Sequence, residues 1–291
     1  MKSVEDIKKV LSSQIKESRY EHILKVIDHS LRLNDKLKLD LDRDKVIYAA
    51  LLHDSCKHLE DEYFEKYKEK YKLDRSLYSE SYNLHSILAG IRAREDFAIA
   101  DDEIIQAIVS HTKGNTHMTK LDKLIYIADA TEPDRSYPGL ESIRKAIEKN
   151  LNLGVLTYMV NNIKYLSESK KEISQDTYEV LDSIRRDIMT EKLDIVLKAC
   201  EDKLAENIKT IEIGEKSPIA DYFVIATGGS LPQMKAIVEE IESKVEEAGY
   251  EIISKEGLRE GGWILIDLGD IIVHVFTEDQ RDFYSLENLW D

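Results

Sequence analysis

The stretch Leu51-Leu52-His53-Asp54 decides how the first part of this 291-residue chain is interpreted. It closes an apolar run that starts at Val46, so it predicts the end of a buried helix. A buried imidazole beside a buried carboxylate is unfavourable unless each group finds a strong partner. A divalent transition metal satisfies both, because imidazole nitrogen and carboxylate oxygen are its ordinary ligands. A simple His-Asp hydrogen bond is the alternative, so the metal hypothesis needs further ligands.

Further candidate ligands occur on other predicted helices. Four histidines fall one per helix or helix end, and these are His22, His53, His85 and His111. Asp129 ends an apolar helix in the same way that Asp54 does. A helical bundle can direct such residues into one pocket, as helical di-metal proteins do. Four histidines and two aspartates in this context favour a metal site over isolated core histidines.

Apolar spacings of three and four residues predict an all-helical region before residue 205. The expected helices cover residues 4–17, 20–33, 46–54, 60–72, 84–93, 102–110, 120–130, 140–149, 153–166 and 176–187. In the charged stretch 60–72, the tyrosines and the phenylalanine are expected to pack inwards. His29 is expected to pack beside the helix of His22, and His58 to lie at the surface.

The pattern changes after another predicted helix at 191–204. Strands are expected at 208–213, 222–227, 251–254, 263–267 and 271–276, with a helix at 232–248 that Gly249 closes. Strands interleaved with helices indicate an α/β domain with a mixed sheet. We therefore predict two domains, an all-α bundle at 1–187 and a smaller α/β domain at 188–291.

Charge and composition narrow the class of protein. Residues 191–291 carry 23 acidic and 10 basic side chains, whereas residues 1–190 carry 34 and 31. This acidic end is expected to repel nucleic acid and to favour basic protein partners. The longest apolar run, seven residues, is too short for a membrane span, and the polar start predicts no signal peptide. Cys56 and Cys200 form no CxxC pair, which indicates a reduced, cytoplasmic protein.

The order His … His-Asp … His … His … Asp resembles that of the HD-domain metal-dependent phosphohydrolases. The flanking residues resemble the YqeK branch over about residues 15–186. The matching motifs are Arg19-Tyr20-Glu21-His22, Leu51-Leu52-His53-Asp54 with Lys57, His111-Thr112-Lys113-Gly114, Ile127-Ala128-Asp129, Glu132-Pro133-Asp134-Arg135 and Pro138-Gly139. This resemblance implies symmetric hydrolysis of diadenosine tetraphosphate to two ADP at a centre of two divalent ions, which would be iron.

The resemblance also implies a role for each matching residue. His22, His53, Asp54 and Asp129 would hold one ion, and Asp54 would bridge to a second ion held by His85 and His111. Asp54 and Lys57 are the expected catalytic residues. The expected substrate-binding residues are Arg19, Lys57, Thr112, Gly114 and Arg135.

Several alternatives remain open for this half. Lys57 and Arg135 could be ordinary surface cations. Asn115 stands where the family often has arginine, and His117 lies close by, so local substrate contacts are expected to differ. Ligand type alone does not distinguish iron from zinc or manganese. The domain could also hydrolyse another nucleotide, such as a deoxynucleotide or a cyclic dinucleotide, or act as a metal-bound sensor.

The acidic end allows a chemical and a docking interpretation. Gly228-Gly229-Ser230, followed later by Asp267 and Asp270, suggests a nucleotidyltransferase. However, the two aspartates are three residues apart across Leu268-Gly269, which predicts a hairpin turn rather than two ligands on one strand face. This spacing disfavours an active site.

The docking interpretation rests on a second resemblance, to the ribosome silencing factor (Iojap-like, RsfS) family, over about residues 190–291. The matching stretches are 217–228, Glu260-Gly261-Gly262-Trp263 with Asp267, Val273-His274-Val275-Phe276 and 281–290. The resemblance implies a nucleotidyltransferase-like fold that binds a large-subunit ribosomal protein and blocks subunit joining.

Trp263 is the leading candidate for the partner contact, because aromatic residues dominate binding hot spots. Its alternative role is a sheet-core tryptophan. Arg281 and Tyr284 are weaker candidates, and Trp290 is expected to anchor the C-terminus in the core.

Overall fold

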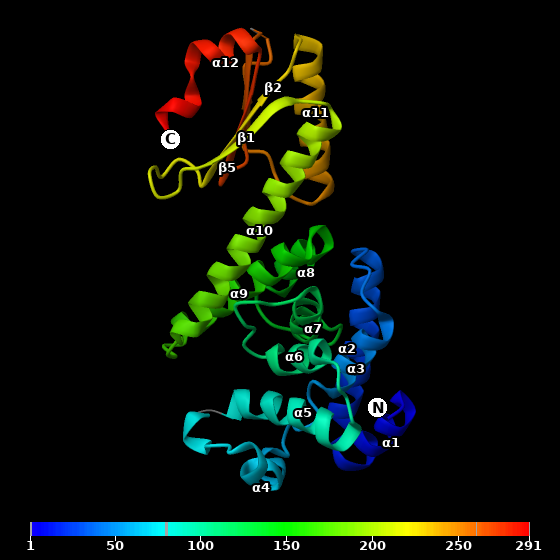
Figure 1. The fold of residues 1–291 in the computed structure, drawn as a ribbon. Coiled ribbons are helices and arrows are strands. Elements are labelled where there is room, and N and C mark those ends of the chain that lie inside the picture. The colour runs from blue at the N-terminus through cyan, green and yellow to red at the C-terminus, as the bar shows by residue number, and fades with distance from the viewer. Residues whose placement is uncertain (1, 79–80, 260, 291) are drawn as a thin grey trace. The chain divides into compact units, whose positions relative to one another are not determined.

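The computed structural model describes residues 2–78, 81–259 and 261–290. The chain divides into two compact units, Met1–Ile184 and Arg185–Asp291 (Figure 1). The described part of the first unit is helical without any strand, and that of the second contains a five-stranded sheet. The predicted order, an all-α region followed by an α/β region, is therefore confirmed.

The first unit is a bundle whose helices closely follow the predicted ones. They are α1 (Val4–Gln14), α2 (Glu17–Lys36), α3 (Arg43–Leu52), α4 (Glu60–Tyr71), α5 (Ser81–Phe97), α6 (Asp102–Ser110), α7 (Lys120–Thr131), α8 (Leu140–Lys149), α9 (Leu151–Glu168) and the start of α10 (Gln175–Asp202), with a short 3₁₀ turn at Arg75–Leu77. Tyr63, Phe64 and Tyr67 of α4 are buried, as predicted.

Helix α3 lies at the centre of the bundle. It packs against α2, α6 and α7, and these helices gather in the middle of the unit in Figure 1. Most of α3 is buried, from Val46 to Leu52 with the single exception of the half-buried Ile47. Because its neighbours cover it from several sides, residues at its C-terminal end face the ends of several other helices at once.

The two helices predicted at 176–187 and 191–204 are one continuous helix, α10. Residues 188–190, which the prediction left between the two helices, are helical because this stretch contains neither glycine nor proline. Ile184 and Ile188 are buried four residues apart, so the apolar stripe also continues through this stretch.

The second unit is built on a mixed sheet with strand order β1-β2-β5-β4-β3. The strands are β1 (Glu206–Glu212), β2 (Tyr222–Thr227), β3 (Ser254–Glu256), β4 (Trp263–Asp267) and β5 (Ile271–Phe276). β2 and β5 are parallel, and the other neighbours are antiparallel. β3 begins later than predicted because its register pairs Ser254 with Asp267, the last residue of β4.

Helices lie on both sides of this sheet. Helix α11 (Leu231–Glu247) buries Met234, Ile237 and Ile241 and packs on β4 and β5. Helix α12 (Glu278–Tyr284) lies on the other side of the sheet from α11 (Figure 1). An aromatic cluster with Phe223, Phe276, Trp263 and Trp290 packs together in this unit. Trp290 thus packs on the core as predicted, whereas helix α12 and the 3₁₀ turn Leu286–Leu289 were not foreseen.

Each unit contains one cysteine. Cys56 in the first unit and Cys200 in the second are buried free thiols. Burial raises the pKa of each to about 12, so both remain protonated at neutral pH. No helix in the described ranges has both the length and the apolar character needed to cross a bilayer.

Candidate metal centre

The motif His53-Asp54 lies in a turn directly after α3. Asp42 caps the start of the helix by accepting a hydrogen bond from the backbone of Asp44, and the helix ends at Leu52. The backbone N–H of Ser55 then donates to the carbonyl of Leu52, and that of Lys57 to the carbonyl of Asp54. These tight turns place both side chains of the motif in the interior, where His53 is fully buried and Asp54 is 4% exposed.

One set of donor atoms comes from α2, α7 and the turn. His22 Nε2 lies 3.0 Å from Asp129 Oδ1 and 3.9 Å from Asp54 Oδ2. His53 Nε2 lies 3.7 Å from Asp54 Oδ2 and 4.0 Å from Asp129 Oδ1. Ligand atoms about 2.1 Å from a shared ion are about 3–4 Å apart, so these separations fit a common metal.

A second set lies on the other side of Asp54. His85 Nε2 from α5 and His111 Nε2 from the end of α6 lie 3.2 and 3.5 Å from Asp54 Oδ1. The two imidazole nitrogens are 3.2 Å apart. Asp54 therefore directs one carboxylate oxygen toward each set. All six predicted ligands converge on this region of the bundle.

The orientation of the imidazoles fits a metal. His53 Nδ1 and His111 Nδ1 lie 2.7 Å from the carbonyl oxygens of Ala50 and Ile108, which can only accept. Each Nδ1 therefore carries the proton, and each Nε2 lone pair points inward. Within the described chain, His53 Nε2 is buried without a hydrogen-bond partner. A buried, unprotonated nitrogen facing two carboxylates is the donor set of a cation site.

The ionisation states agree with this assignment. Burial lowers the pKa of His53 to about 4, so it is neutral at pH 7. Burial alone would raise the pKa of Asp54, but the surrounding His53, His111 and His85 lower it well below its ordinary value. The pKa of Asp129 is likewise lowered despite its burial, by the His22 hydrogen bond and by His53 and Arg135. Burial also lowers the pKa of His85, whereas the hydrogen bond to Asp54 and the charges of Asp54 and Asp129 raise that of His111 despite its burial. The centre thus offers a neutral His53 imidazole and two ionised carboxylates.

Three predicted substrate-binding cations lie beside these donor groups. Arg19 donates to Asp54 Oδ2 at 2.6 Å, and Arg135 donates to Asp129 Oδ1 at 2.5 Å. Lys57 Nζ lies 3.3 Å from His85 Nδ1. All three side chains are partly exposed, so the centre has positive charge where it approaches solvent.

The loop after α6 contains the other predicted substrate residues. Thr112 Oγ1 lies 3.4 Å from Ser86 Oγ, and Gly114 adopts a φ of +72° that favours glycine. Asn115 donates to Ser110 Oγ and accepts from the backbone N–H of His117, both at 2.7 Å. Both ends of the Asn115 amide therefore hold the loop, while the side chain of His117 is exposed.

Glu132 is a member of the site to which the sequence interpretation gave no role. It is 4% exposed, and its Oε1 lies 3.4 Å from His22 Nδ1. A carboxylate in this position fixes the orientation of a ligand histidine. The position of Glu132 directly after α7 could have indicated such a role. An acidic side chain at a helix C-terminus interacts unfavourably with the helix dipole, so another favourable contact is expected for it.

His29 lies on α2 itself, the helix that carries His22, rather than beside it, whereas His58 is at the surface as expected. His29 is buried on α2, with its Nε2 3.1 Å from Thr131 Oγ1, and burial lowers its pKa to about 4. His58 is exposed.

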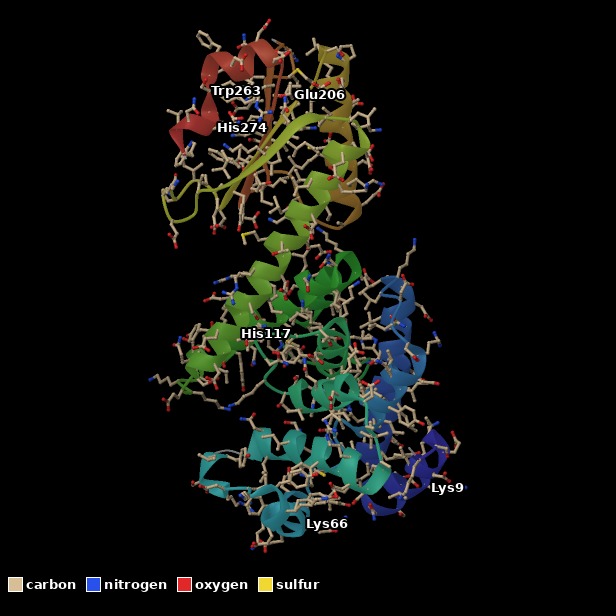
Figure 2. All side chains as sticks on the ribbon, viewed as in Figure 1. Lys9, Lys66, His117, Glu206, Trp263 and His274 are labelled. Carbon is tan, nitrogen blue, oxygen red and sulfur yellow. The ribbon has the colours of Figure 1, made fainter. Side chains whose placement is uncertain are left out.

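The candidate partner residues of the second unit lie around one aromatic face. Trp263 is half-buried and stacks on Phe276, and its indole N–H donates to His274 Nδ1 at 3.2 Å (Figure 2). Tyr284 contacts the Trp263 ring and is 44% exposed. Arg281 is paired with Glu287 and donates to Thr227 Oγ1. Of the three, Tyr284 is the most accessible.

The aspartates weighed for a nucleotidyltransferase site each have a structural partner. Asp267 Oδ1 accepts from the backbone N–H of Gly269, whose φ is +90°, in the turn between β4 and β5. Asp270 is paired with Lys192. The predicted hairpin turn is confirmed.

A helical bundle that directs four histidines and two aspartates into one buried centre is characteristic of the metal-dependent HD-domain hydrolases. Comparison with known proteins agrees: residues 19–134 match the HD domain family, and residues 186–291 match the family described as "Ribosomal silencing factor during starvation".

Individual relatives cover each part separately. A Halalkalibacterium halodurans protein named "Bis(5'-nucleosyl)-tetraphosphatase, symmetrical" is 31% identical over 58% of this chain and 89% of its own. The Bacillus subtilis "Ribosomal silencing factor RsfS" is 45% identical over 34% of this chain and 83% of its own. A Clostridium acetobutylicum crystal structure, described as a predicted HD superfamily hydrolase involved in NAD metabolism, is 32% identical, covers 64% of this chain and 98% of its own, and gives a TM-score of 0.59.

The chain therefore belongs to two families, the symmetrical bis(5'-nucleosyl)-tetraphosphatases of the HD-domain class in its first part and the ribosomal silencing factors in its second.

Proposed function

We propose that the first unit hydrolyses diadenosine tetraphosphate symmetrically to two ADP. The proposal is supported by relatives that are named for this activity. This chain matches most of the length of each of them. The observation that carries it is Asp54, whose two carboxylate oxygens each face a separate set of imidazoles. Such a carboxylate suits a pair of metal ions, which hydrolases of phosphate esters commonly use.

In this proposal, His22, His53, Asp54 and Asp129 hold one ion, and Asp54, His85 and His111 hold the other. When bound, the ions supply Lewis-acid activation of water and of a phosphoryl oxygen. Glu132 orients His22, and the carbonyls of Ala50 and Ile108 orient His53 and His111.

The cations at the edge of the centre bind the phosphate chain. Arg19 and Arg135 lie against the carboxylates of Asp54 and Asp129, within reach of anionic groups that approach the centre. Lys57 is positioned beside His85 and neutralises charge that develops on the leaving phosphate. Thr112 and Gly114 follow the ligand His111 in sequence. Their hydroxyl and backbone groups bind the part of the substrate next to the phosphates.

We assign iron to both positions on the strength of the family resemblance. Metal analysis of anaerobically purified protein is expected to find about two iron atoms per chain. Full zinc occupancy together with full activity would refute the assignment.

Product analysis tests the reaction itself. Purified chain is expected to convert diadenosine tetraphosphate to ADP alone, whereas AMP plus ATP would indicate asymmetric cleavage. A panel with deoxynucleotides and cyclic dinucleotides tests the alternative that another nucleotide is the substrate. A protein that binds metal but hydrolyses none of them would instead be a sensor.

We further propose that the second unit, with a functional boundary after residue 187, docks in the cytoplasm on a protein of the large ribosomal subunit, blocks subunit joining and lowers translation. Membership of the silencing-factor family supports this proposal. The excess of acidic side chains in residues 191–291 suits a basic ribosomal protein, because complementary charge raises the rate of encounter.

Trp263→Ala tests the docking surface, with Tyr284→Ala as a milder companion. We expect both variants to lose co-sedimentation with large subunits and to keep the hydrolase activity. Because Trp263 also packs on Phe276, the fold of its variant must be checked through the fluorescence of Trp290. Undiminished co-sedimentation of both folded variants would contradict this surface.

A further inference from the structure

Arg92 on α5 is 1% exposed and is among the largest side chains that are fully buried in the chain. Its guanidinium stays charged at any physiological pH, so its burial requires strong partners. An apolar side chain of similar volume would often stabilise a protein interior as well or better. The position therefore calls for an explanation other than packing.

The partners of Arg92 come from four parts of the bundle. One terminal nitrogen donates to the backbone carbonyl of Ser55 at 2.5 Å, and the other donates to Gln14 at the end of α1. Its Nε lies 3.7 Å from Asp96, and the guanidinium lies over the ring of Tyr63, 4.4 Å from the centroid. This fork of donors holds α1, α4, α5 and the turn after α3 together.

Two of these connections reach the metal centre. Ser55 directly follows Asp54, and it lies in a turn rather than in a helix that could supply a partner for its carbonyl. Arg92 follows His85 by seven residues, which places both on one face of α5, about 10 Å apart along the axis. One buried side chain thus ties the helix of His85 to the backbone beside Asp54.

We propose that Arg92 is a positioning residue for the second metal position, and that it sets the 3.2 Å separation between His85 Nε2 and Asp54 Oδ1. This inference rests on the proposed two-metal centre. Without the contact to Ser55, the turn and α5 are no longer held to each other at this point. The first position shares Asp54 with the second, but its other ligands come from α2, α7 and His53, and none of its ligands lies on α5.

The experiment titrates the metal-free full-length chain with Mn²⁺ and counts bound ions by the loss of the free-ion EPR signal. The variants are Arg92→Lys, which keeps the charge but lacks the planar fork, and Arg92→Met, which keeps only the bulk. Phe97→Leu is the matched control, because Phe97 is fully buried beside Arg92 but its side chain has no group that could donate a hydrogen bond to the carbonyl of Ser55. Melting temperatures are measured for all proteins, and titrations are done well below them.

We expect the wild type and Phe97→Leu to bind two ions with equal affinities. Arg92→Lys is expected to bind the first ion normally and the second about 10- to 100-fold more weakly, as for other residues that orient metal ligands. Should Arg92→Met fail to fold, Arg92→Lys still decides the question.

Two ions bound to Arg92→Lys with wild-type affinity would overturn the role of Arg92 while leaving the proposed centre intact. The same weakening in Phe97→Leu would show that Arg92 acts only through stability. Fewer than two ions in the wild type would overturn the centre and this role together.

Discussion

His53 in the helical unit and His274 in the α/β unit are alike in isolation. Both are buried, burial lowers the pKa of each to about 4, and in the described chain each has a buried Nε2 without a hydrogen-bond partner. Their neighbours differ. His53 faces the carboxylates of Asp54 and Asp129, whereas His274 lies among the rings of Phe223, Trp263 and Phe276.

This difference teaches that burial of a histidine does not by itself mark a metal site. A site requires donor atoms that converge, and those around His53 come from residues far apart in sequence. The described neighbours of His274 supply an indole N–H and aromatic rings. The first histidine is therefore suited to chemistry and the second to the packing of a sheet face.

The largest expected contrast comes from Asp54→Ala. Removal of the carboxylate that faces both imidazole sets is expected to lower hydrolysis about 1,000-fold or more, as for other groups that act as a unit. Co-sedimentation with large ribosomal subunits is expected to be unchanged. Residual hydrolysis within tenfold of wild type would show that this carboxylate is not central.

Removal of the metal should have the same effect as Asp54→Ala: hydrolysis should be lost while docking is kept. After treatment with a chelator and its removal, we expect hydrolysis to fall to background and to return when Fe²⁺ is added under anaerobic conditions. Docking on the large subunit should proceed equally with and without metal. Loss of docking in the metal-free protein would contradict the independence of the two units, because docking would then depend on the metal centre of the first unit.

Low pH is expected to lower the stability of the second unit through His274. Its pKa is about 4 in the folded chain and about 6.5 when unfolded, so the unfolded chain binds a proton that the folded chain excludes. The free energy of unfolding is therefore independent of this group above pH 6.5. It falls by about 3 kcal/mol as the pH is lowered toward 4.

Tryptophan fluorescence during urea unfolding can measure this loss, because both tryptophans, Trp263 and Trp290, lie in the second unit. His274→Phe, which keeps an aromatic ring, is expected to abolish this dependence between pH 6.5 and 4. An unchanged pH profile in the variant would assign the acid sensitivity to other groups.

The smallest expected effect is at a helix start. Thr119 and Asp122 form a capping box at the beginning of α7, the helix that carries Asp129. Thr119→Ala is expected to lower the stability of the first unit by about 1 kcal/mol, measured by urea unfolding followed with circular dichroism. Since the cap lies far along α7 from Asp129, the metal stoichiometry should not change. A loss of bound metal would mean that the start of α7 matters to the centre.

Much of this architecture could be predicted from local sequence. The helix ends near Asp54 and Asp129 follow from apolar runs that stop at a charged residue, and the β4–β5 turn follows from Leu268-Gly269. The sequence predicted two helices, 176–187 and 191–204, where the structure has the single helix α10, although no glycine or proline lies between them.

Roles that depend on contacts distant in sequence were also beyond prediction. Arg92 appears in the sequence as an ordinary charged residue of a helical segment, and the place of Glu132 directly after α7 signals a role without naming its partner. Their burial, and their contacts with the backbone of Ser55 and the ring of His22, arise only when the bundle packs. The convergence of the six ligands was predicted, but the atoms that orient them were not.

The single buried cysteine in each unit gives the folded protein a pair of internal reporters. A thiol of pKa about 12 without solvent access does not react with alkylating reagents until its surroundings open. Pulsed alkylation followed by mass spectrometry would thus time the opening of each half independently, at Cys56 for one and at Cys200 for the other, in the native chain and without an added label.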